Sequence, residues 1–219
     1  MPRILFEKKG DSVWISHLDL MRLFQRAFKR AGLNLKHSQG YNPRPMVSIA
    51  LPLSVGVESV CELLDFELEG QELPCSEILE RLRGALVAGV TVKDVYEQGS
   101  KIKNLALLDC LVTMEYDSGV TDEILQNLQE LFARDALLVE KKGKNSVTEQ
   151  DIIPMIKKIQ VRKADDHTVL LDARICCQNP TLNPSQLAAA VERYLPDCKA
   201  DFVTCRRIEI YDTEEKIFR

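Results

Sequence analysis

The spacing of apolar and polar positions predicts two successive units with the same order of elements. The first series comprises a strand at 4–8, a helix at 17–31, an apolar run at 46–53, a strand at 61–68, a helix at 76–86 and a strand at 90–96. The second comprises strands at 107–116, 137–141, 155–163, 169–177 and 202–211, with helices at 121–133 and 184–194. We interpret both as β-α-β-β-α-β, the second with one additional strand.

This element order with short connections is typical of the split-βαβ, ferredoxin-like sandwich, in which both helices cover one face of an antiparallel sheet. We therefore expect an α+β chain of tandem ferredoxin-like domains, at residues 1–98 and 105–219. The stretch EQGSKIKN at 97–104 is the predicted linker, and KKGKNS at 141–146 is a predicted inserted loop. The alternative is one continuous mixed sheet without independent halves.

Composition narrows the class of protein. The chain has 219 residues, of which 45% are hydrophobic and 28% charged, and this balance excludes disorder. It contains no apolar run long enough to cross a membrane, and its N-terminus lacks the apolar stretch of a signal peptide, so we expect a cytoplasmic protein without a membrane partner. Seven cysteines without a C-x-x-C motif predict no metal site, and the absence of nucleotide-binding motifs predicts no cofactor.

Charge is distributed unevenly along the chain. Residues 1–57 contain nine Lys or Arg against three acids, whereas the remaining residues contain 20 against 30. This asymmetry indicates a surface for an anionic partner on an otherwise acidic body, which disfavours general binding to DNA. Chance unevenness is the alternative.

The predicted helix at 17–31 separates apolar from basic positions. Its apolar stripe is Leu20, Phe24, Ala27, Phe28 and Ala31, and its cations are Arg22, Arg26, Lys29 and Arg30. Only Asp19 is spaced to pair with one of these cations, Arg22. The arrangement suits phosphate oxygens, and an ordinary solvated face is the alternative.

The segment Lys36–Pro45, KHSQGYNPRP, combines planar side chains with cations and backbone-restricting residues. Single-stranded RNA is recognised by base stacking and phosphate contacts. We expect Tyr41 to stack on a base, Asn42 to read a base edge, and Arg44 and Lys36 to bind phosphates. A rigid connection whose polar groups only satisfy its turns is the alternative.

His17 and His37 are the candidate catalytic residues if the chain is a nuclease. His17 lies in the first helical turn, where the helix dipole favours the neutral imidazole that a general base requires. Lys36, His37 or Tyr41 would then serve on the opposite side of the scissile bond. A capping role for His17 and a loop role for His37 form the favoured interpretation, so the sequence favours a protein that is not an enzyme.

Residues 16–59 resemble a known family. The runs SHLDLMRLFQRA, RAGL, HSQGYNPRP and ALPLSVGVES are similar to the uncharacterised bacterial "radical SAM-linked" proteins, which occur alone or C-terminal to a radical SAM domain. The resemblance implies tRNA, rRNA or ribosome biology beside a radical SAM partner. This chain lacks the C-x-x-x-C-x-x-C cluster motif and cannot itself be that enzyme.

The expected architecture also resembles, more distantly, the RAMP endoribonucleases that process CRISPR repeats. Those proteins carry a late glycine-rich loop, whereas only Gly119 and Gly143 follow residue 100 here. Three hypotheses follow. The leading one is a non-enzymatic RNA-binding accessory protein; the others are a metal-independent endoribonuclease using His17 and a protein-interaction adaptor without an RNA role.

Overall fold

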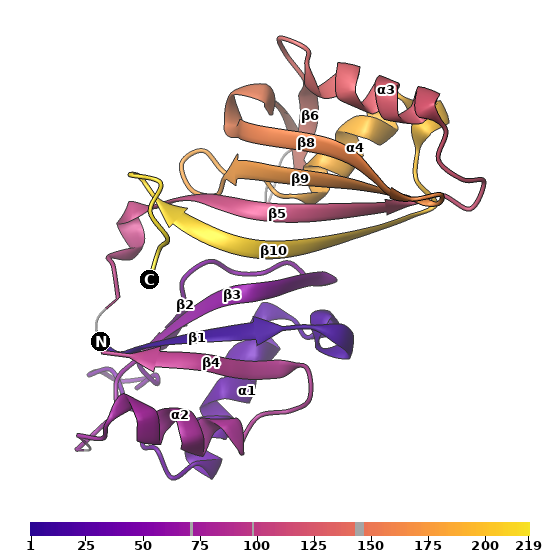
Figure 1. The fold of residues 1–219 in the computed structure, drawn as a ribbon. Coiled ribbons are helices and arrows are strands. Elements are labelled where there is room, and N and C mark those ends of the chain that lie inside the picture. Colours follow the sequence, from indigo (N-terminus) through magenta and orange to yellow (C-terminus); the bar gives the residue numbers. More distant parts are fainter. Residues whose placement is uncertain (71, 98, 143–146) are drawn as a thin grey trace. The chain divides into compact units, whose positions relative to one another are not determined.

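The computed structural model describes residues 1–70, 72–97, 99–142 and 147–219. The chain divides into two compact units, Met1–Lys103 with Arg219 (unit 1) and Asn104–Phe218 (unit 2). Each unit combines two α-helices with an antiparallel sheet, which confirms the expected α+β class (Figure 1). No helix in these residue ranges is long and apolar enough to cross a membrane.

Unit 1 has the element order predicted for the first half of the chain. Its elements are β1 (Arg3–Lys8), η1 (Gly10–Trp14), α1 (His17–Arg30), β2 (Val47–Ile49), β3 (Val57–Phe66), α2 (Cys75–Arg83), β4 (Val90–Tyr96) and η2 (Ile102–Asn104). The strands pair antiparallel in the order β4-β1-β3-β2, and both helices lie on one face of this sheet (Figure 1). The second strand and third strand are therefore neighbours in space, and the first strand lies at the centre.

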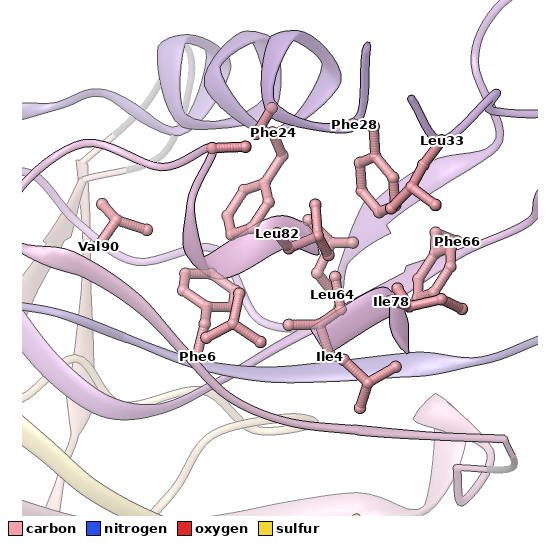
Figure 2. Close-up of a cluster of buried hydrophobic side chains, with 14 of the residues drawn as sticks. Ile4, Phe6, Phe24, Phe28, Leu33, Leu64, Phe66, Ile78, Leu82 and Val90 are labelled. Carbon is pink, nitrogen blue, oxygen red and sulfur yellow. The ribbon is translucent and has the colours of Figure 1, made fainter. Parts of the chain in front are cut away.

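The core of unit 1 lies between α1, α2 and the sheet, and Figure 2 shows its buried side chains. The predicted apolar stripe of α1 is confirmed, because Leu20, Phe24, Ala27 and Phe28 are all buried. The rings of Phe6 and Phe24 meet edge to face with centroids 4.7 Å apart. This packing fixes which side of α1 remains exposed.

The ends of α1 follow from local chemistry. The Ser16 side chain accepts a hydrogen bond from the backbone N–H of Asp19, as the capping pattern predicts. The helix ends at Arg30, and Gly32 has a φ of +68°, a left-handed conformation that favours glycine after a helix. Both boundaries are set by residues next to the basic face.

Unit 2 repeats the strand order of unit 1. Its elements are β5 (Leu105–Glu115), α3 (Asp122–Phe132), β6 (Leu138–Lys142), β7 (Val147–Asp151), η3 (Ile153–Met155), β8 (Ile156–Asp165), β9 (Thr168–Cys176), α4 (Ser185–Tyr194), η4 (Pro196–Cys198) and β10 (Phe202–Asp212). The main sheet pairs antiparallel in the order β10-β5-β9-β8. Its strands thus follow the same fourth-first-third-second arrangement, with β6 and β7 as an addition.

The hairpin of β6 and β7 corrects one sequence prediction. The predicted loop at 141–146 is wrong at Lys141 and Lys142, which lie within β6 and pair with Thr148 and Val147. Residues 143–146 lie outside the described part of the chain. The sequence did not predict β7, because most of its side chains are exposed and it has no alternation of apolar and polar positions.

A charged pair joins the first and third strands of each unit. In unit 1, Arg3 on β1 donates to both carboxylate oxygens of Asp65 on β3, at 2.5 and 3.0 Å. In unit 2 the charges are exchanged: Arg174 on β9 donates to Asp109 on β5 at 2.8 and 3.0 Å. Tyr211 donates to the same carboxylate at 2.8 Å. The two units therefore share an Arg–Asp pair between their first and third strands as well as a strand order.

We predict that Asp109→Asn lowers the stability of unit 2 by about 1–2 kcal/mol at pH 7. Partial burial raises the pKa of Asp109, but hydrogen bonds from Arg174 and Tyr211 outweigh it and hold the pKa below its ordinary value. A carboxylate with a lowered pKa stabilises the folded state above the unfolded pKa, about 3.9, and loses this effect as pH falls.

Urea unfolding followed by circular dichroism at pH 7 and at successively lower pH measures this effect. The difference between the variant and the unsubstituted protein should shrink below about pH 4. Asp172→Asn, at an exposed position of β9, is the matched control and should change stability little. An equal loss for Asp109→Asn at all pH values would contradict the electrostatic explanation.

Candidate nucleic-acid interface

The exposed side of α1 borders a surface cavity lined by three arginines. Arg22, Arg26 and Arg30 follow one another at intervals of four residues, about one helical turn, and we call them the arginine face. The cavity has a volume of about 470 Å³, and its remaining lining residues are Ile15, Asp19, Leu23 and Val87. The cavity is therefore lined by three guanidinium groups and one carboxylate.

The hydrogen-bond partners of the three arginines differ. Arg22 pairs with Asp19 at 2.9 Å, as the sequence spacing predicts. Arg30 donates to the carbonyl oxygen of Ala85 and so ties α1 to the segment after α2. Within the residue ranges that the structure describes, the guanidinium group of Arg26 has no hydrogen bond or ion pair. The arginine face thus retains donors for an external anion.

Asp19 is the single acid among the described residues that line the cavity, and its carboxylate already accepts hydrogen bonds. The hydroxyl of Ser16 donates to one carboxylate oxygen at 2.7 Å, and Arg22 donates to the other. Ser16 and then Arg22 lower the pKa of Asp19 below its ordinary value. The carboxylate consequently remains ionised and neutralises one guanidinium of three, which leaves the cavity positive.

Lys29 is exposed on α1 but does not line this cavity. The predicted row of four cations is therefore divided: three arginines share the hollow, and the lysine lies beside it. This division follows from helical geometry, because Lys29 is offset by one residue from the four-residue repeat of the arginines.

The loop at 36–45 is a projection with a paired neck. Ser38 donates its backbone N–H to the carbonyl of Arg44 at 2.9 Å, and Met46 donates to the carbonyl of Lys36 at 2.7 Å. His37 and Pro45 form an antiparallel bridge between these bonds. The neck is also joined to the end of β3, because Lys36 donates to the carbonyl of Glu67. The hydrogen-bonded neck therefore anchors the tip of the loop.

The tip carries the predicted stacking and edge-reading residues. Tyr41 is 99% exposed, and Asn42 and Arg44 are exposed as well. Lys36 is less available, because its ammonium pairs with Glu67 at 2.9 Å, and this hydrogen bond raises the pKa of Lys36. None of the described residues that line the arginine cavity comes from this loop. The two predicted surfaces are therefore separate features of unit 1.

The two candidate histidines lie at opposite ends of the unit 1 sheet. His17 comes two residues after Ile15. The carbonyl of Ile15 accepts a hydrogen bond from Lys8, which lies at the C-terminal end of β1. His37 follows Lys36, whose backbone N–H donates to the carbonyl of Glu67. Glu67 comes shortly after Asp65, which pairs with Arg3 at the N-terminal end of β1. The six residues of β1 separate these ends by about 17 Å. The structure therefore does not bring His17 together with His37 or Lys36.

His17 has one unusual property. Its Nδ1 atom is buried and has no hydrogen-bond partner in the part of the chain that the structure describes. The Ser16 side chain, and not His17, caps the helix through the Asp19 N–H. A general base also needs an acid on the opposite side of the leaving group, and His37 and Lys36 lie at the other end of β1 from His17.

The described residues contain no group of three or more His, Cys, Asp or Glu side chains arranged to hold a metal ion. All seven cysteines are free. Burial raises the pKa of Cys110 to about 12 and the pKa of Cys205 to about 11, so these thiols remain protonated at neutral pH. The cysteines of unit 2 act as small apolar core residues.

Two features near the arginine face were not found by sequence reasoning. Trp14 is 70% exposed, whereas Lys8, which donates to the carbonyls of Val13 and Ile15, is only 1% exposed. Trp14 ends η1, and Ile15 and Ser16 after it are extended, so the four-residue spacing of the arginines along α1 gave no signal for it.

Comparison with solved structures shows similarity of fold. A chain of a Cbf5-Nop10-Gar1 complex is 12% identical with a TM-score of 0.53, covering 95% of this chain and 48% of that chain. A chain of an H/ACA RNP bound to a substrate RNA containing 2′-deoxyuridine is 10% identical with a TM-score of 0.47, covering 94% and 46%. The protein thus spans about half the length of these chains.

Sequence comparison assigns a family. No curated protein matches the chain significantly. Residues 2–184, which include both the arginine face and the 36–45 loop, match a family described as an uncharacterized protein conserved in bacteria. The chain therefore belongs to this bacterial family, DUF2344.

Proposed function

We propose that this chain is a non-enzymatic RNA-binding accessory protein, in which unit 1 binds the phosphates of a tRNA, an rRNA or a ribosomal particle. The observation that carries the proposal is the cavity along α1, where three arginines surround a hollow containing one neutralised acid. Arginine presents a planar fork of donors that suits phosphate oxygens. The proposed RNA-binding residues are Arg22, Arg26, Lys29, Arg30, Lys36, Tyr41, Asn42 and Arg44.

The geometry favours RNA over an acidic protein partner for two reasons. Arg26 has unoccupied donors in the described part of the chain, while its neighbours Arg22 and Arg30 are held in position by their own hydrogen bonds. The unit also projects a fully exposed ring, Tyr41, from an ordered loop. Cations together with accessible aromatic rings serve recognition of single-stranded nucleic acid, where phosphates and base faces are both available.

The finer parts of the proposal are its fold family and its partner. We propose that the two units are tandem ferredoxin-like domains, supported by the shared strand order and the exchanged Arg–Asp pairs. We propose a separately encoded radical SAM protein as partner, supported by the resemblance of residues 16–59. The bound RNA would be presented to that enzyme.

Binding assays with purified protein test the proposal. Fluorescence anisotropy with labelled total tRNA and with a single-stranded 12-nucleotide RNA should show affinity that weakens steeply with salt. The adaptor hypothesis predicts no RNA binding at any salt concentration. Absence of binding to both RNAs at low salt would overturn the proposed function.

Incubation of the RNA with protein in excess EDTA separates binding from cleavage. We expect intact RNA, because His37 and Lys36 lie at the other end of β1 from His17. Fragments ending in 2′,3′-cyclic phosphate that disappear with the His17→Ala variant would establish the endoribonuclease alternative.

We predict that Tyr41→Ala weakens binding of single-stranded or loop RNA by about 1–3 kcal/mol, whereas Tyr41→Phe has almost no effect. The ring is fully exposed, so its removal costs no packing in the free protein. The anisotropy assay measures both variants, and circular dichroism confirms their folding. Equal losses for the two substitutions would show that the hydroxyl, and not stacking, makes the contact.

A further inference from the structure

We infer that Trp14 is a base-stacking platform at the N-terminal end of the arginine face, where an unpaired nucleobase of the bound strand packs on the indole. The inference deepens the proposed function and rests on it. Trp14 is the chain's single tryptophan and the last residue of η1, and two residues separate it from the start of α1. It is the largest apolar side chain, and a folded chain normally buries such a group.

Trp14 is exposed together with two other apolar side chains. Its exposed fraction is 70%, that of Leu18 in the first turn of α1 is 66%, and that of Val55 is 52%. The indole lies beside the loop that contains Val55, because a Cβ at Gly56 would lie 3.5 Å from its Cζ3 atom. Exposed apolar side chains that gather around one aromatic ring indicate a binding surface.

Hydrogen bonds from a buried lysine hold the backbone on both sides of Trp14. The buried ammonium of Lys8 donates to the carbonyl of Val13 at 3.1 Å and to that of Ile15 at 2.8 Å, so it holds the residues directly before and after Trp14. Gly56 donates its N–H to the same Val13 carbonyl at 2.9 Å. A rigid aromatic loses little entropy when it binds a ligand. The exposed ring is therefore preorganised.

The adjoining charges indicate which ligand occupies the platform. Ile15, the residue after Trp14, lines the arginine cavity. Side chains on a helix lean toward its N-terminus, and the N-terminus of α1 is the end next to Trp14 in the chain. An occupant must therefore combine a flat apolar face with neighbouring anionic groups. A nucleobase within a sugar–phosphate strand meets both requirements.

The acids near the indole are consistent with a base rather than a phosphate on the ring itself. Asp11 lies exposed in η1, and Glu58 accepts a hydrogen bond from the backbone of Gly10. These carboxylates oppose a phosphate placed directly against η1, whereas an uncharged base is unaffected. The strand would then place its base at Trp14 and its phosphates along α1.

Intrinsic fluorescence tests this inference directly, because Trp14 is the chain's single tryptophan. The probes are a fluorescein-labelled 12-nucleotide oligo(A), an abasic oligomer of the same length, and unlabelled oligo(A) for the tryptophan measurement. We expect oligo(A) to quench the fluorescence and the abasic oligomer to bind without quenching. Trp14→Ala should weaken oligo(A) binding about 10- to 100-fold, and Trp14→Phe less than threefold.

Phe202→Ala is the matched control, because Phe202 is an exposed aromatic residue of unit 2. Circular dichroism establishes that each variant is folded. Salt-dependent binding of oligo(A) without quenching, and with equal affinity for Trp14→Ala, would overturn the inference and leave the proposed function intact. Failure of the unsubstituted protein to bind either labelled oligomer, or tRNA, would overturn both.

Discussion

Replacement of Arg22, Arg26 and Arg30 together by Gln is expected to weaken RNA binding roughly 100-fold near physiological salt. The loss corresponds to about 3 kcal/mol, or about 1 kcal/mol for each charged contact that is removed. The effect should be similar for RNAs of different sequence, because phosphate contacts carry no sequence information. Fluorescence anisotropy with labelled tRNA and with a single-stranded oligomer measures it.

A structural contribution must be separated from this loss of charge, since Arg30 also donates to the carbonyl of Ala85. The double variant Arg22→Gln with Arg26→Gln retains that bond and should still show most of the effect. Lys157→Gln with Lys158→Gln, at exposed positions of β8, removes two charges from unit 2 and serves as the control. Equal weakening by the control pair would show that binding depends on overall charge and not on the arginine face.

Lys8→Met is expected to destabilise unit 1 by about 3–5 kcal/mol. Lys8 and the nearby Glu62 are each 1% exposed, and burial lowers the pKa of Lys8 while the Glu62 carboxylate opposes this shift. The substitution removes the buried positive charge that faces this carboxylate. It also leaves the carbonyls of Val13 and Ile15 without the donor that Lys8 provides.

Urea denaturation followed by circular dichroism measures the change. The double variant Lys8→Met with Glu62→Leu removes both buried charges and should recover part of the lost stability. Lys9→Met, at a partly exposed neighbouring position paired with Glu7, should change stability by less than about 0.5 kcal/mol. A loss for Lys9→Met as large as that for Lys8→Met would contradict a specific role for the buried ammonium.

The sequence predicted the features that depend on local chemistry and periodicity. In α1, the Ser16 cap, the apolar stripe and the Asp19–Arg22 pair all follow from spacing along one helix, and the structure confirms each of them. The order of strands and helices in unit 1 was predictable for the same reason, because alternation distinguishes strands from helices. Because the apolar stripe of α1 packs in the core, its basic side remains exposed.

The features that the sequence did not predict depend on contacts between distant segments. Lys8 ends a strand and is typical of a solvated terminus, but the turn of η1 folds over it and supplies two carbonyl acceptors. Trp14 follows a buried valine, yet the 3₁₀ turn directs it outward. The separation of His17 from His37 also required the strand pairing, since both flank the same helix in sequence.

The salt dependence of RNA binding tests the central claim most directly. The logarithm of the association constant of a single-stranded RNA should fall linearly with the logarithm of salt concentration, with a slope of about −0.7 for each phosphate contact. The account predicts that the variant lacking Arg22, Arg26 and Arg30 has a slope shallower by about 2 units while it remains folded. An unchanged slope and affinity in this variant would contradict the assignment of the arginine face as the phosphate-binding surface.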